Sequence, residues 1–267
     1  AGQATVAYFR GSVQNLTEPD KLGMNLNITR MESNRADLLR FMSLGDTPMD
    51  SLLAQPLPAY VNVSGDVSGN MAKLELTLGG EIGALQTSAA PADTSGSVLQ
   101  FDISGSLTQV NNPDSMGMDL TLNGVDAPRN FFAFLEPKGL RFPDHLEVTG
   151  TLQGPLAALQ TDLQVKAQRG SANSSLAFKG LIKNIRTPDQ LGFDANFDAL
   201  LARSEILGYV PDSVVTNVLR LPEFTQVKGN AKGTTKNANG LVTIGLGALG
   251  QIQMNGSLRD STYDMDL

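Results

Sequence analysis

Cysteine and histidine, which supply most metal ligands and many catalytic groups, are almost missing from this chain. Its 267 residues contain no cysteine and a single histidine, His145. The absence of cysteine excludes disulfide scaffolds, thiolate metal sites and cysteine nucleophiles, and is compatible with an oxidising compartment. One histidine excludes most His-rich metal centres and catalytic triads. We therefore expect a protein that is not an enzyme, with no cofactor and no metal site.

Positive charge and long apolar runs are also scarce. The formal net charge is −7 and the isoelectric point is near 4.7, with no basic tract, which argues against nucleic acid as a partner. The sequence has no run of 18 apolar residues, the length of a membrane-spanning helix, and no pattern of a signal peptide. A hydrophobic content of 41% with 27 glycines nevertheless indicates an ordered chain with an extended core.

A signature in two parts occurs three times in the same order. The first part is a glycine followed eight residues later by a Pro-Asp-x-[Leu/Met]-Gly segment; these segments read PDKLGMNLNIT, PDSMGMDLTLN and PDQLGFDANFD and start at Pro19, Pro113 and Pro188. The second part follows the pattern [LF]P-x4-V-x-G-x3-G and starts at Leu57, Phe142 and Leu221. Fixed spacing inside one chain predicts an array of homologous repeats. We place the repeats at 11–104, 105–179 and 180–255, with a partial repeat at 256–267, and expect the array to be cut from a longer protein.

Most of the repeated segments alternate between apolar and polar residues, as a strand with one dry and one wet face does. In the first signature Met24, Leu26 and Ile28 alternate with polar residues, and the later copies alternate in the same way. Glycines at fixed positions suit a bend or bulge that recurs in every repeat. The sequence therefore predicts a mainly β fold, an elongated array of antiparallel strands curled into a U-shaped trough, with about five strands in each repeat.

Between the two signatures the period changes to that of a helix. The segments NRADLLRFM, from Asn34, and TPMDSLLA, with Thr47 as N-cap, are typical of short helices, and the corresponding segments that start at Asp126 and Asp198 occupy the same slot. We predict a helical insert in each repeat, at about 28–60, 126–140 and 199–220.

Three motifs resemble sites of chemistry but are better explained as structural features. GLGALG (245–250) resembles a dinucleotide loop, but its spacing is wrong and no crossover helix follows, so we expect a tight turn or bent strand. The aspartates of the alternating segments read as the wet faces of strands. His145 stands where the other copies have Tyr60 and Phe224, which predicts an aromatic slot at a strand entry.

The apolar strand faces are the candidate binding surface. Their ordinary interpretation is a closed sandwich core; their functional interpretation is an open hydrophobic trough. The residues expected to line that trough are Met24, Leu26, Ile28, Val63, Leu76, Phe101, Met118, Leu120, Leu122, Val148, Phe193, Phe197, Val227 and Ile244.

The repeated signatures, the helical insert between them and the last residues, SLRDSTYDMDL, resemble the bacterial TamB family of translocation and assembly module proteins, relatives of the AsmA-like bridge proteins. The long repeats look more like the Bacteroidetes branch of that family. The resemblance implies a periplasmic "β-taco" that shields phospholipid acyl chains on their way between the inner and outer membranes. It also implies a parent protein anchored in the inner membrane outside this segment, and a TamA-type outer-membrane barrel as a possible partner.

Two alternatives stay open at the level of sequence. One is a chaperone-like scaffold that assembles outer-membrane proteins by β-augmentation at open sheet edges. The other is a structural β-repeat stalk with a dry, closed core.

Overall fold

The structure is a computed structural model that describes residues 5–42, 57–86, 98–112, 115–131, 142–185, 187, 190–209, 221–259 and 262–266. The chain divides into two compact units. The first unit comprises residues 1–111 and 122–146, and the second comprises residues 112–121 and 147–267.

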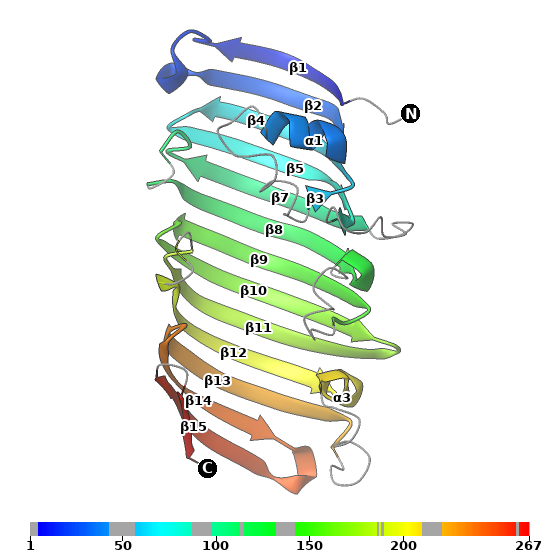
Figure 1. The fold of residues 1–267 in the computed structure, drawn as a ribbon, viewed down its shortest axis with the longest axis vertical. Helices are drawn as coiled ribbons and strands as arrows, with labels where there is room; N and C mark the ends of the chain where they lie inside the picture. The colour runs from blue at the N-terminus through cyan, green and yellow to red at the C-terminus, as the bar shows by residue number, and fades with distance from the viewer. Residues whose placement is uncertain are drawn as a thin grey trace. The chain divides into compact units, whose positions relative to one another are not determined.

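Both units are built from antiparallel strands that pair in chain order (Figure 1). The first unit contains β1 (Val6–Gln14), β2 (Gly23–Asn34), β4 (Tyr60–Asn70), β5 (Lys73–Gly83), β7 (Val98–Thr108) and the later part of β8 (Gly117–Pro128), with a small pair, β3 (Leu57–Pro58) and β6 (Leu85–Gln86). The second unit contains most of β9 (His145–Pro155), then β10 (Ala158–Arg169), β11 (Ala172–Lys183), β12 (Gly192–Ala202), β13 (Phe224–Thr234), β14 (Asn237–Gly245), β15 (Gln251–Arg259) and β16 (Thr262–Asp266). The predicted mainly β, antiparallel fold is confirmed.

The repeats are visible in the cross-strand register. The matching pairs are Gly11 with Leu26 and Met24 with Gly69 in the first repeat, and Gly180 with Ala195 and Phe193 with Gly233 in the third. Each of these repeats contributes four long strands, β1, β2, β4 and β5 or β11, β12, β13 and β14, so the expectation of about five was wrong.

A feature that the sequence did not suggest also repeats. Among the described residues, three other than glycine have positive φ: Asn15 (56°), Gln109 (52°) and Asn184 (56°). Each lies four residues before the proline of a first signature. The side-chain amides of Asn15 and Asn184 donate to the carbonyl oxygens of Lys21 and Gln190, at 2.9 and 3.1 Å. Asparagine tolerates the left-handed region because its short side chain can bond locally in this way.

Helical segments lie in the predicted slot between the two signatures. Helix α1 (Arg35–Met42) is capped by Asn34, whose Oδ1 accepts from the N–H of Asp37 at 2.9 Å. In the second copy, residues 129–131 form a 3-10 turn, and in the third, helix α3 (Arg203–Tyr209) follows β12. The expected segments at 47–54, 132–137 and 210–220 lie outside the described residues.

Three helix boundaries were predicted too early. In the first repeat, β2 continues to Asn34, where helix was expected from about residue 28. Strand β12 continues from Asp198 to Ala202, and β8 continues from Asp126 to Pro128, where helix was expected. Residues 199–202 pair with Phe224–Val227 of β13, and these ladder bonds override the helical preference of Ala-Leu-Leu-Ala. The GLGALG segment does form a turn, with a short 3-10 helix (Gly247–Leu249) between β14 and β15, as expected.

Backbone contacts across the sheet explain the fixed glycines of the second signature. Gly65 has φ of 137°, and a Cβ placed on it would lie 2.0 Å from the carbonyl oxygen of Thr77 on β5. Gly150 is equivalent, with φ of 140° and the carbonyl oxygen of Asp162 at 2.0 Å. Because the obstructing atoms belong to the backbone, no rotamer change relieves the clash. The positive φ and the close approach of the neighbouring strand therefore require glycine at this position in the first and second copies.

We expect Gly65→Ala to destabilise the protein by at least about 2 kcal/mol, from positive-φ strain together with the backbone clash. Gly124→Ala is the matched control, because Gly124 also lies in a strand and has nothing within 4 Å of its would-be Cβ. Urea unfolding of both variants measures the difference. Equal stabilities for the two variants would contradict this explanation of the glycine at position 65.

Candidate functional site

The predicted lining residues of the first unit lie on one face of its strands. Register places Met24, Leu26 and Ile28 opposite Gly69, Val67 and Gly65. The same face continues through β4, β5 and β7, because residues directly opposite each other share a face. The predicted residues on this apolar face of the first unit are Met24, Leu26, Ile28, Val63, Leu76, Phe101 and Leu122, all half-buried.

The second unit has an apolar face of the same kind. Phe193 and Phe197 of β12 face Gly233 and Gly229 of β13, and Val227 faces Ile244 of β14. The phenyl ring of Phe197 covers Gly229, where a Cβ would approach the ring to 2.6 Å. The predicted residues on this apolar face of the second unit are Met118, Leu120, Val148, Phe193, Phe197, Val227 and Ile244, again all half-buried. Their role in lining a trough stays a prediction.

The opposite face of the strands is polar and carries cross-strand ion pairs. Lys232 Nζ lies 2.7 Å from Asp194 Oδ2, and Lys179 Nζ lies 2.8 Å from Asp162 Oδ2. These hydrogen bonds raise the pKa of Lys179 and of Lys232 above the usual value. The aspartates of the alternating segments thus belong to the solvated face, as the sequence predicted.

Helices cover one margin of each apolar face, where the strand residues are small or polar. In the second unit, α3 contacts β11 and β12, and the nearby Ser174 and Thr225 are only 5% and 3% exposed. In the first unit, Ser33 lies at the start of α1 and is 6% exposed. The apolar side chains farther along the same strands remain half-buried. A helix that formed the second layer of an ordinary core would instead cover the large apolar residues.

An acidic residue in the first turn of each helix ties it to the sheet. Arg169, at the end of β10, donates from Nε and Nη2 to the two carboxylate oxygens of Glu205 in α3, at 3.0 and 3.1 Å. These side chains are 17% and 8% exposed. In α1 the carboxylate of Asp37 accepts from the hydroxyl and the N–H of Thr5, at 2.8 and 2.7 Å. The hydroxyl and then the N–H of Thr5 hold the pKa of Asp37 below its usual value.

A hollow of about 240 Å³ opens on the apolar face of the second unit, across β12, β13, β14 and β15. Its floor is a row of small residues, Ala231, Gly240 and Gly256, directly opposite one another on neighbouring strands. The next residues of the same face, two positions away along each strand, form the two walls. One wall consists of Phe197, Val242 and Met254, and the other of Phe193, Ala238 and Leu258. We call this hollow the apolar groove; no charged side chain lines it.

Of the groove residues, the sequence prediction named Phe193 and Phe197 and missed the rest. The signal that was available is the second signature itself. It reads Gly-x-Val-x-Gly in the first copy, with Val67 at its centre, but Gly-x-Ala-x-Gly in the third, with Ala231 there. A small residue at this position indicates a hollow only when the residues opposite it on the neighbouring strands are also small.

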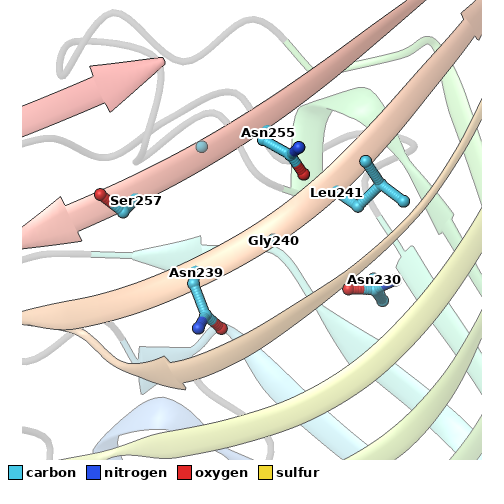
Figure 2. Close-up of a pocket in the computed structure, with 7 residues that line it drawn as sticks. Asn230, Asn239, Gly240, Leu241, Asn255 and Ser257 are labelled. Atoms are coloured by element: carbon cyan, nitrogen blue, oxygen red, sulfur yellow. The ribbon is translucent and has the colours of Figure 1, made fainter. Parts of the chain in front are cut away.

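A second hollow, of about 390 Å³, lies on the polar face around Gly240 (Figure 2). It is lined by Asn230, Asn239, Asn255 and Ser257, and by Leu241. Its amide and hydroxyl groups are those of a solvated strand face, because all four polar residues are exposed or half-exposed. None of these lining residues is an acid or a base that would activate the Ser257 hydroxyl.

His145 lies at the entry to β9, at the predicted position, with its Nε2 2.8 Å from Asp126 Oδ2. Both side chains are more than two-fifths exposed, at 41% and 43%. Among the residues that the structure describes, no three His, Asp or Glu side chains gather as a metal site would require. Within the same residues, no helix has the length and apolar character needed to cross a bilayer.

Comparisons of the chain with protein-family models, with curated proteins and with solved structures find no match.

We expect Glu205→Ala to lower the free energy of unfolding by about 3–5 kcal/mol, because it leaves the buried guanidinium of Arg169 without its carboxylate. The double variant Arg169→Met with Glu205→Leu should recover most of that loss, since it removes both charges and keeps apolar volume. Urea unfolding distinguishes the two cases. A double variant as unstable as the single one would show that the ion pair is not what holds α3.

Proposed function

We propose that this chain is a segment of a periplasmic bridge protein whose apolar strand faces shield phospholipid acyl chains during transport between the inner and outer membranes. The observation that carries the proposal is the half-buried apolar face in each unit, opened in the second unit into the apolar groove. Such a surface favours hydrocarbon over water by about 0.8 kcal/mol for each methylene group that it removes from water.

Burial distinguishes this proposal from a structural stalk. A closed core would bury its largest apolar residues, whereas the described residues that are nearly inaccessible here are mostly alanines, serines and threonines. Phe193, Phe197 and Met254 all keep part of their surface accessible. Large apolar surface held open on ordered strands is typical of a site that a ligand or partner completes.

The arrangement of charge fits the same proposal. The ion-paired polar face stays in water, and the accessible lining of the groove is almost wholly apolar, so little polar surface has to lose its hydration when hydrocarbon enters. Binding of this kind has no fixed geometry, so it suits acyl chains of different lengths. It requires no catalytic group and no cofactor.

The family and the partner are parts of the proposal as well. The repeated signatures and helical inserts resemble the TamB family, whose members are anchored in the inner membrane and are associated with a TamA-type barrel in the outer membrane. We therefore propose a periplasmic location and a barrel of that type as a candidate partner.

We expect Phe197→Arg to reduce photo-crosslinking of a diazirine-labelled phospholipid while the protein still folds. A charge among acyl chains costs about 2.5–3.5 kcal/mol on insertion scales, but on an open face the long side chain can still reach water. Leu120→Arg tests another position on the apolar face of the second unit. Asn196→Arg is the matched control, because Asn196 precedes Phe197 on β12 and is exposed on the polar face.

Thermal unfolding, measured beside crosslinking, separates the alternatives. Retained folding with lost crosslinking supports the proposal. A variant that unfolds indicates a closed core, and a folded variant with unchanged crosslinking removes the lipid proposal.

A further inference from the structure

The residues that form the floor of the apolar groove, in the third repeat, are smaller than those at the equivalent positions of the first repeat. In the first unit, one row across the strands runs Gly11, Leu26, Val67, Leu76, Gly105. In the second unit, the equivalent row runs Gly180, Ala195, Ala231, Gly240, Gly256. Both rows begin and end with glycine, but the three central residues are large in the first unit and small in the second.

We propose that the apolar groove is a discrete binding position for one phospholipid acyl chain, which lies across strands β12 to β15 with its methylenes on Ala231 and Gly240. This inference rests on the proposed function and narrows it. Hydrocarbon is held preferentially at this place in the second unit, instead of sliding along equally apolar walls.

The dimensions of the groove fit one slender chain. The two walls are four residues apart along each strand, so their backbone atoms are about 13 Å apart. The side chains of the walls narrow the space between them. Four strands spaced about 4.8 Å apart give a floor of about 14 Å. Half of a hydrocarbon core about 30 Å thick, the reach of one acyl chain, is about 15 Å.

The shape and charge of the groove also select its occupant. The groove has a volume of about 240 Å³. The walls are almost wholly apolar and no charged side chain lines them. The headgroup of the lipid therefore stays outside the groove, in water.

The chain itself supplies a variant that fills the groove. The position of Ala231 is occupied by Val67 in the first copy of the second signature and by Leu152 in the second copy. Ala231→Leu therefore introduces a residue that another copy of the same signature already carries. Val67→Leu is the matched control, since it enlarges the equivalent position of the first unit, where the floor is already filled.

The test uses phosphatidylethanolamine vesicles in which one acyl chain carries a diazirine near its end. Crosslinked residues are mapped by mass spectrometry. In the unaltered chain we expect adducts to concentrate on Phe193, Val242, Met254 and Leu258 over the equivalent residues of the first unit. We expect Ala231→Leu to reduce these adducts about tenfold, equivalent to about 1.4 kcal/mol of binding, and Val67→Leu to leave them unchanged.

Several outcomes overturn the inference. Adducts spread evenly over both units refute a discrete position and leave the proposed function standing, whereas no adducts anywhere contradict both. Labelling of the groove by photoreactive palmitate but not by the phospholipid points to free fatty acid and refutes the assigned occupant. Thermal unfolding of Ala231→Leu shows whether its effect is local, and the adduct map of the unaltered chain decides the question even if that variant is unstable.

Discussion

The cross-strand register is the constraint on which the other features depend. Every long strand in the described residues pairs with antiparallel neighbours, and equivalent positions of the first and third repeats are paired in the same register. Gly65 and Gly150 sit where the backbone of the next strand comes too close for a side chain. A slip of one residue would turn the whole apolar set of a strand to the polar side. The glycines and the alternation therefore specify one register together.

The register also explains why stability and an open surface coexist. The backbone hydrogen bonds of each inner strand are satisfied by its neighbours, and the margin covered by helix buries Ser174, Thr225 and the Arg169–Glu205 pair. The apolar strip beside that margin is not needed to complete a closed core. It remains available to a hydrocarbon ligand, which would stabilise the protein by binding only the folded chain.

The sequence predicts those features that depend only on residues close together in one segment. Alternation around Met24 shows which residues share a face, and the helical segment that starts at Asn34 predicts α1, although its cap by Asn34 was not predicted. The end of β12 was not predictable, because Asp198–Ala202 suits a helix as well as a strand and the choice is made by pairing with β13. The apolar groove was not predictable either, since its floor forms only where Ala231, Gly240 and Gly256 come together from three strands.

Native mass spectrometry of the purified protein tests the central claim most directly, namely that the apolar faces hold phospholipid. The account predicts protein ions that carry the mass of a phospholipid and lose it on mild collisional activation, with no such adduct for Phe197→Arg. The absence of lipid adducts from the unaltered, folded protein, both as purified and after incubation with phospholipid vesicles, would contradict it.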